Sequence, residues 1–150
     1  MKRKLLLIPF STVLLTGCFS FFPKQEEIKE EKTKQEITHS YDEVESLTIF
    51  WSEIFKQSES EYYVYLYSET CSHCNSIKDL MIEYALTQKT TIYFIKSSSE
   101  HNLSDIASTG VNNLSDLYIR GYPSLLKLKD KTVISNLAGV TPIKTELGIK

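Results

Sequence analysis

The sequence predicts an α/β domain in which a central mixed β-sheet is flanked by helices. Residues 62–67 read Tyr-Tyr-Val-Tyr-Leu-Tyr, which is typical of a strand that is covered on both faces. From Ile77 to Ala85, apolar residues recur at the spacing of one helix face, and residues 90–96 form a second apolar strand. A strand, a helix and a strand at this spacing make a βαβ unit, so these two strands should be parallel.

The folded domain is expected to span residues 41–150 and to begin with a helix. Apolar residues at positions 47, 50, 51, 54 and 55 share one helix face. They predict an amphipathic helix of about three turns, with Trp51, the only tryptophan, packed in the core. Residues 97–113 are polar with scattered apolar side chains, and we expect one or two short helices there.

The end of the chain predicts a hairpin and a closing helix. Residues 124–128 and 132–137 are apolar stretches joined by a short polar turn, which indicates two antiparallel strands. Thr141 followed by Pro142 predicts the N-cap and the first residue of a short helix that ends near Gly148.

The first 17 residues predict a signal segment. Three basic residues precede an uncharged stretch, residues 5–16, which is too short for a stable membrane span. The segment ends in Leu-Thr-Gly-Cys at residues 15–18, which resembles the lipobox of bacterial lipoproteins. The resemblance implies cleavage before Cys18, lipid attachment to that cysteine, and a location on the extracytoplasmic face of the cell membrane. An ordinary secretory signal with a coincidental cysteine is the alternative.

Residues 18–40 are expected to form the lipidated N-terminus and a charged tether. Lys24–Glu36 interleave Lys and Glu with Gln and Thr, and Ile28 is their only apolar residue, so this stretch buries too little surface to fold alone. The whole chain has a net charge of -2, and loss of the three basic residues of the signal segment makes it -5. This balance argues against nucleic-acid binding and leaves membrane attachment to the lipid.

The chain contains three cysteines, two of which form a C-x-x-C motif, Cys71-Ser72-His73-Cys74, at the predicted strand–helix junction. With Cys18 assigned to the lipid, no thiol remains for a structural disulfide, so we interpret the pair as redox-active. Cys71 should have a lowered pKa, because unpaired N–H groups and the helix dipole favour its thiolate. His73 either adds charge or a hydrogen bond there or is a passive surface residue. Cys74, about one turn further on, should be more buried.

The order of elements around this motif resembles the thioredoxin family. Tyr118–Leu126 (Tyr-Ile-Arg-Gly-Tyr-Pro-Ser-Leu-Leu) is similar to the stretch around the cis-proline of that family, and the resemblance spans Glu45–Ile149. It implies that Pro123 is cis and packs beside the cysteine pair. It also implies that the Tyr122 backbone, together with Thr70, binds an extended substrate.

The sequence departs from the usual family pattern at several positions. Tyr65 stands six residues before Cys71, where many members have a buried acid that relays a proton. Proton transfer from Cys74 would then depend on water or another group. Ser-His replaces Gly-Pro between the cysteines, and Thr70 stands where a tryptophan often precedes the motif.

These features predict a monomeric thiol–disulfide oxidoreductase that acts on protein thiols and disulfides and needs no cofactor. In the expected cycle, Cys71 attacks a substrate disulfide and Cys74 resolves the mixed disulfide, with His73 and Pro123 completing the catalytic group. The direction is open: a histidine before the second cysteine resembles the oxidising members, whereas a single domain is the usual build of an extracytoplasmic reductant.

Two other interpretations are kept. The chain could be a redox-inactive thioredoxin-like binding module of an export system. Alternatively, Cys71, His73 and Cys74 could bind zinc or copper, although a structural zinc site needs four ligands and the sequence has no second C-x-x-C. His39 and His101 are isolated in the sequence and could complete such a site only through the fold.

Overall fold

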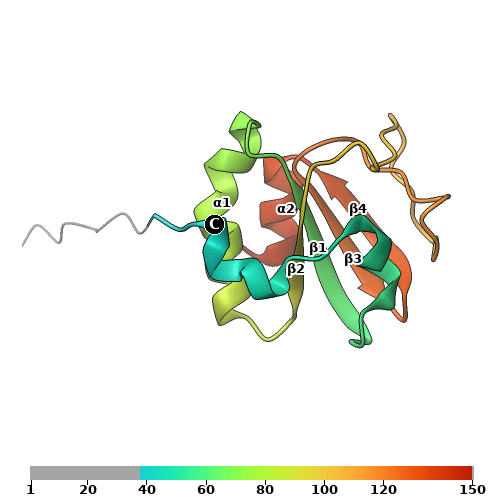
Figure 1. Ribbon diagram of the computed structural model, residues 1–150, viewed down its shortest axis with the longest axis horizontal. Helices are drawn as coiled ribbons and strands as arrows, with labels where there is room; N and C mark the ends of the chain where they lie inside the picture. The colour runs from blue at the N-terminus through green and yellow to red at the C-terminus, as the bar shows by residue number, and fades with distance from the viewer. Residues whose placement is uncertain (1–37, 150) are drawn as a thin grey trace, which may run out of the picture. The chain divides into compact units, whose positions relative to one another are not determined.

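A four-stranded mixed β-sheet organises residues 38–149, the part of the chain that this computed structural model describes (Figure 1). Its spatial order is β2-β1-β3-β4. β1 is parallel to β2 and antiparallel to β3, and β3 forms an antiparallel hairpin with β4. The predicted mixed sheet with a buried central strand is confirmed. The strands are β1 (Glu61–Tyr67), β2 (Ile92–Lys96), β3 (Ser124–Lys129) and β4 (Thr132–Ala138).

Two α-helices, α1 (Ser72–Thr87) and α2 (Val140–Leu147), pack on the same face of the sheet (Figure 1). α1 connects β1 to its parallel neighbour β2, which confirms the predicted βαβ unit. The predicted start of α2 was wrong by two residues, because Gly139 is the N-cap and Thr141 lies inside the first turn. Gly139 has a φ of 91°, a conformation that suits glycine and turns the chain from β4 into the helix.

The predicted helix over positions 47–55 does not form. Two short 3-10 helices, η1 (Tyr41–Leu47) and η2 (Trp51–Lys56), flank an extended segment instead. In that segment Thr48 pairs with Phe94 of β2, and the N–H of Ile49 donates a hydrogen bond to the Phe94 carbonyl at 3.0 Å. The edge of β2 thus provides hydrogen-bond partners for this backbone segment, and a continuous helix could not form those hydrogen bonds.

Glutamate side chains fix the start of both 3-10 helices. The Ser40 N–H donates to the Glu43 carboxylate at 2.7 Å, and the Phe50 N–H donates to Glu53 at 2.8 Å. Trp51 is buried as predicted, whereas Phe50, assigned to the same helix face, is 76% exposed.

Residues 97–123, all of which the structure describes, contain no helix, so the expected short helices were wrong. The segment is held by side-chain hydrogen bonds instead. The Asn102 side chain donates to the carbonyls of Leu114 and Leu117, at 3.0 and 3.2 Å. Leu103 and Ile119 form an isolated β-bridge. An asparagine that satisfies backbone carbonyls in this way stabilises an irregular chain path.

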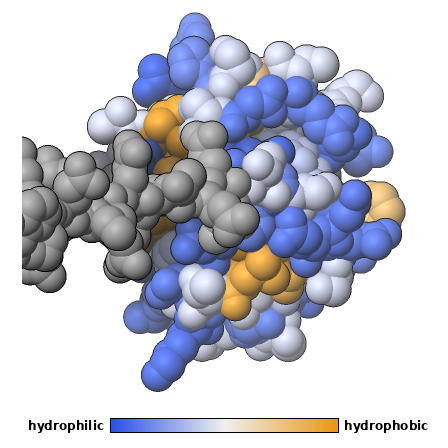
Figure 2. Space-filling view, turned by 90° about the vertical axis from the view of Figure 1, so that its left-hand side faces the viewer, coloured by the Kyte–Doolittle hydropathy of each residue, from blue (hydrophilic) through white to orange (hydrophobic). Residues whose placement is uncertain are grey.

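Alternate residues of β1 separate two hydrophobic clusters. The helical face, as we call it, carries α1, α2 and η1 and buries Tyr63, Tyr65, Tyr67, Cys74, Ile77, Met81, Ile82, Phe94 and Ile143 among others. The irregular face is covered by η2 and by the segment 97–123, and buries Trp51, Ile54, Tyr62, Val64, Leu66, Leu117 and Ile119 among others. Seen from the side of α1, the surface is mostly hydrophilic, with small separate hydrophobic patches (Figure 2).

The predicted signal segment, Cys18 and most of the predicted tether lie outside the described residues. Among the helices that the structure does describe, none combines the length and the apolar character needed to cross a bilayer.

Candidate functional site

The C-x-x-C motif lies where β1 gives way to α1. Cys71 is the N-cap residue of α1, and its sulfur accepts a hydrogen bond from the Cys74 backbone N–H at 3.4 Å. This is the usual role of an N-cap side chain, performed here by a thiol. Both residues are free cysteines: Cys71 is half-buried and Cys74 is fully buried.

The two thiols of the motif have opposite electrostatic environments. Burial is the largest influence on the pKa of Cys71 and acts to raise it. Hydrogen bonds from the Cys74 thiol and from the backbone N–H groups of Cys74 and His73 outweigh burial and lower that pKa below its ordinary value. For Cys74, burial raises the pKa to about 12, opposed in part by a hydrogen bond from the Ser68 N–H at 3.5 Å. Of the two thiols, Cys71 is therefore the one that ionises more readily near neutral pH.

The second wall of the site is the segment that enters β3. The peptide bond between Tyr122 and Pro123 is cis, and Pro123 is buried. The Cys71 thiol donates a hydrogen bond to the Tyr122 carbonyl at 3.5 Å. The Ser124 hydroxyl donates to the carbonyl of Gly121 at 2.7 Å and so fixes the turn. Tertiary folding therefore brings Cys71, Cys74, Tyr122 and Pro123 together, as the sequence led us to expect.

Thr70 and His73 lie on the exposed side of the motif. The Thr70 hydroxyl is 3.1 Å from that of Ser68, within the turn before Cys71. His73 acts on the site through its backbone, because its N–H helps to lower the pKa of Cys71 and its carbonyl accepts a hydrogen bond from Ser76. Both of these contacts are made by the backbone of His73, and a role for its side chain stays a prediction.

His101 joins the site, which its place in the sequence gave no reason to expect. Its Nδ1 is 2.6 Å from the Tyr122 hydroxyl, and its ring packs on Trp51 of η2 with the ring centroids 4.6 Å apart. The imidazole is only 7% exposed, and burial lowers its pKa, so the neutral ring is favoured. In the sequence, His101 is only a histidine within a polar segment. Its link to the site depends on contacts with Tyr122 and Trp51, which are distant in the chain.

Tyr65 is fully buried on the helical face, in the same cluster as Cys74. Its hydroxyl and that of Tyr41 are buried and interact with each other, but neither makes a well-formed hydrogen bond to a described residue. Burial raises the pKa of both hydroxyls, so they stay protonated at neutral pH. Tyr65 therefore does not replace the expected acid as a charged group.

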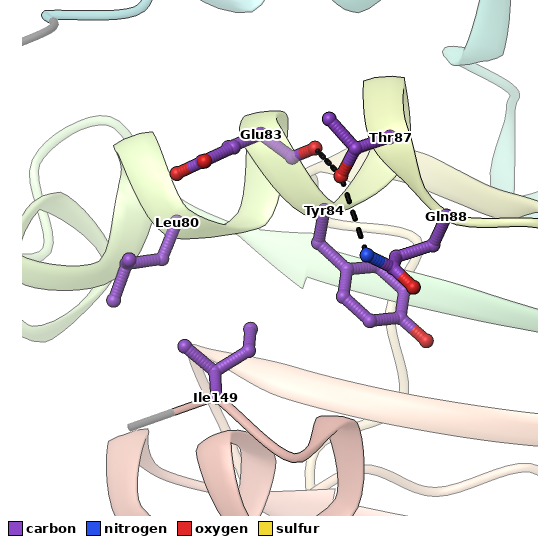
Figure 3. Close-up of a pocket in the computed structure, with 6 residues that line it drawn as sticks. All are labelled: Leu80, Glu83, Tyr84, Thr87, Gln88 and Ile149. Atoms are coloured by element: carbon purple, nitrogen blue, oxygen red, sulfur yellow. Dashed lines mark hydrogen bonds between the residues drawn. The ribbon is translucent and has the colours of Figure 1, made fainter.

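Two of the hollows on the surface of the described residues bear on the location of the site. One, of about 370 Å³, lies where β2 ends, and His101, Trp51 and Phe50 contribute to its lining. Because β1 and β2 are parallel, this hollow lies at the sheet edge that also carries the C-x-x-C motif. The other, of about 190 Å³, lies between the second half of α1 and Ile149 (Figure 3).

The hollow in Figure 3 lies away from the cysteines, which occupy the opposite end of α1. The Thr87 hydroxyl beside it donates a hydrogen bond to the Glu83 carbonyl at 2.7 Å, within the last turn of α1. Within residues 38–149, no three His, Cys, Asp or Glu side chains are grouped so as to hold a metal ion.

The sequence matches no protein-family model and no curated protein. Among solved structures it is similar to thioredoxins at low identity, including the following three. Thioredoxin f2 from Chlamydomonas reinhardtii is 11% identical over 67% of this chain and 89% of that one, with a TM-score of 0.47. The long form of spinach chloroplast thioredoxin f is 15% identical over 76% and 95%, with a TM-score of 0.46. Schistosoma mansoni thioredoxin is 14% identical over 69% and 94%, with a TM-score of 0.45.

The arrangement of this chain itself carries the fold assignment. A β1–α1–β2 unit with C-x-x-C at the start of its helix is followed by a β3–β4 hairpin entered through Pro123, and then by α2. The fold is thioredoxin-like. The close Cys71–Cys74 pair fits the C-x-x-C geometry of that fold.

Proposed function

We propose that this protein is a thiol–disulfide oxidoreductase that exchanges disulfides with protein substrates. The observation that supports this most strongly is the contrast between its two thiols. Cys71 is accessible and its pKa is lowered, whereas Cys74 is buried and its pKa is raised to about 12. A pair of this kind has one thiol ready to attack and one held back, as a two-step exchange requires.

The two steps of the proposed cycle balance as follows. The Cys71 thiolate attacks a substrate disulfide, one substrate sulfur leaves as a thiolate, and a mixed disulfide forms. Cys74 then loses its proton and attacks the Cys71 sulfur. The Cys71–Cys74 disulfide forms, and the second substrate sulfur leaves and takes up a proton. Overall the substrate disulfide is reduced and the pair is oxidised, and the reverse sequence oxidises a substrate dithiol.

The backbone around Tyr122 is the proposed docking point for the substrate chain. Its carbonyl already accepts a hydrogen bond from the Cys71 thiol at 3.5 Å. An extended peptide that pairs with this segment would therefore bring its own sulfur close to Cys71. Thr70, exposed on the other side of the motif, completes the proposed substrate-binding surface.

We further propose that the domain works outside the cytoplasm, attached to the membrane through lipid on Cys18. The support for this is the lipobox-like Leu-Thr-Gly-Cys at residues 15–18 behind a basic and then uncharged segment. Mass spectrometry of the N-terminal peptide and membrane fractionation test it. Wild-type protein should carry acyl chains and sediment with membranes, and Cys18→Ser should do neither. If Cys18 carries no acyl chains in protein isolated from the producing cells, the lipid anchor is refuted and the redox proposal is unaffected.

Trapping of mixed disulfides tests the redox function. Cys74→Ser should accumulate disulfide-linked adducts with partner proteins, because the resolving sulfur is gone. Cys71→Ser is the matched control and should trap none. Insulin reduction by the wild type should exceed the rate with either variant. If Cys74→Ser forms no adducts while Cys71 still reacts with iodoacetamide, the redox role is refuted and the binding-module interpretation gains.

The pH dependence of alkylation tests the contrast between the thiols. Because the pKa of Cys71 is lowered, its alkylation rate should reach half of its plateau below the value of about 8.5 that an ordinary cysteine shows. Cys74 in the Cys71→Ser background should stay unreactive until far higher pH. A Cys71 midpoint at or above that of a free cysteine would contradict the proposed activation.

A further inference from the structure

Cys74 has to ionise in the resolving step, yet its surroundings oppose this. The thiol is fully buried, and burial raises its pKa to about 12. The donor that the structure shows for it, the Ser68 N–H, is 3.5 Å away. A single hydrogen bond gives a buried anion little stabilisation compared with the loss of water around it.

Two buried hydroxyl groups, those of Tyr41 and Tyr65, belong to the cluster that contains Cys74 and have no partner other than each other. The two hydroxyls interact, but neither makes a well-formed hydrogen bond to a described residue. Buried polar groups in proteins are nearly always paired, because an unpaired one costs about 1–3 kcal/mol. The charge state of Cys74 affects the pKa of both tyrosines, so both hydroxyls are within electrostatic reach of its sulfur. Both remain protonated, so the pair keeps an O–H that can donate beyond the contact between the two hydroxyls.

The two tyrosine rings are held firmly by their neighbours. Tyr41 stacks on Tyr67, with the ring centroids 3.8 Å apart and the planes 18° from parallel. Tyr65 packs edge-on against Phe94, with the centroids 5.7 Å apart. The hydroxyls reach the same cluster from η1 and β1, so they are preorganised and need no rearrangement when charge develops on sulfur.

We propose, building on the oxidoreductase function proposed above, that the hydroxyls of Tyr41 and Tyr65 and the thiol of Cys74 hold one internal water. An internal water needs two to four polar partners, and these three groups supply them. During resolution, the water and the hydroxyls donate the hydrogen bonds that stabilise the Cys74 thiolate. The tyrosines are positioning residues: they stay protonated, and the proton lost by Cys74 ends on the departing substrate sulfur.

A nitrobenzoate disulfide reagent, DTNB, separates the two steps. Cys71 attacks it and releases one coloured thiolate, and Cys74 then displaces the second from the mixed disulfide. We would use the full-length chain with Cys18→Ser, so that the motif provides the only two thiols. Tyr65→Phe removes one hydroxyl and keeps the ring. We expect it to slow the second release on the order of tenfold at neutral pH and to move its pH midpoint upward, with the first release unchanged.

Tyr63→Phe is the matched control. Tyr63 lies on the same strand and the same face, but its hydroxyl donates to Glu146 at 3.1 Å rather than lying near Cys74. Loss of the Tyr63 hydroxyl should lower stability without changing the rate at which the second coloured thiolate is released. If Tyr65→Phe fails to fold, Tyr41→Phe gives the same measurement from the other hydroxyl.

The inference is overturned if Tyr65→Phe and Tyr63→Phe both release the second thiolate at the wild-type rate with the wild-type pH midpoint. A wild-type protein that releases no second thiolate would instead refute the proposed function itself. The two failures are therefore distinguishable in one experiment.

Discussion

Both faces of the sheet are buried, but they are covered in different ways. On the helical face, α1 and α2 lie over the sheet, and tyrosine hydroxyls and Cys74 are enclosed with the apolar side chains. On the irregular face, η2 and the segment 97–123 cover a cluster that is mostly aliphatic. Tyr122 contacts both clusters.

This difference suggests a division of labour. The helical face carries the two cysteines and, in the proposed mechanism, the groups that tune them. The irregular face supplies Trp51 and His101, which hold the side chain of Tyr122 while its carbonyl contacts Cys71. Residues in irregular segments can hold Tyr122 in this way because the rigid sheet fixes the position of both ends of each segment.

The largest expected effect on stability comes from the same cavity-creating substitution in each of the two faces. Ile82 of α1 and Ile119 of the irregular segment are both fully buried. Ile82→Ala and Ile119→Ala should each lower the free energy of unfolding by about 2–5 kcal/mol, measured by urea denaturation. A cost below about 1 kcal/mol for Ile119→Ala alone would mean that the irregular face is a loose cover and not part of the core.

Alkaline pH should weaken both faces through their tyrosines. Burial raises the pKa of Tyr62, on the irregular face, to about 12, and it also raises that of Tyr65 on the helical face. A folded-state pKa above the unfolded value near 10 means that the stabilisation is complete below pH 10. It is lost as the pH rises from there through the folded-state pKa. Urea unfolding between pH 8 and 11 should show this decline, and it should be shallower in Tyr65→Phe. A decline of unchanged slope in that variant would contradict the burial of its hydroxyl.

Removing the Tyr122 hydroxyl tests the link between the faces. Tyr122→Phe breaks the 2.6 Å hydrogen bond to His101 and leaves a buried nitrogen unpaired, so it should cost about 1–2 kcal/mol of stability. Reduction of insulin should slow, while alkylation of Cys71 by the small reagent iodoacetamide should not change. Tyr118→Phe, in the same segment but exposed, is the control. Equal slowing of both reactions in Tyr122→Phe would show that the link acts on Cys71 reactivity and not on substrate docking.

The smallest effect is expected at the rim of the helical face. Lys127 of β3 forms ion pairs with Glu61 at 3.2 Å and with Glu146 of α2 at 3.6 Å. Lys127→Met should change stability by no more than about 1 kcal/mol, because such pairs near solvent contribute little and are screened by salt. A larger loss, insensitive to salt, would show that α2 is held mainly by this lysine and not by Ile143.

Sequence periodicity worked where packing follows regular elements. The strand at β1, the helix α1 with Cys71 at its start and the β3–β4 hairpin were all predicted from the spacing of apolar residues and turn signals. The helical pattern at positions 47–55 failed, because Thr48 and Ile49 find backbone partners on Phe94, which is distant in the sequence. A local sequence pattern does not show that the backbone can instead form hydrogen bonds with the edge of a distant strand.

The candidate site shows the same limit. Cys71, Cys74 and Pro123 could be picked out because the motif and the proline segment have recognisable local sequences. Tyr41 and His101 could not, since each becomes relevant only through a neighbour from another element. The signal segment and Cys18 lie outside the described residues and stay predictions.

The sequence by itself determined the α/β class, the order of the main elements and the position of the reactive pair, because these follow from short-range periodicity and capping. Only the tertiary structure decided what surrounds that pair. It placed two buried hydroxyls in the cluster that contains Cys74 and a buried histidine beside Tyr122. The physical reason is that desolvation and hydrogen bonding, which set the reactivity of a thiol, depend on which distant residues are packed around it.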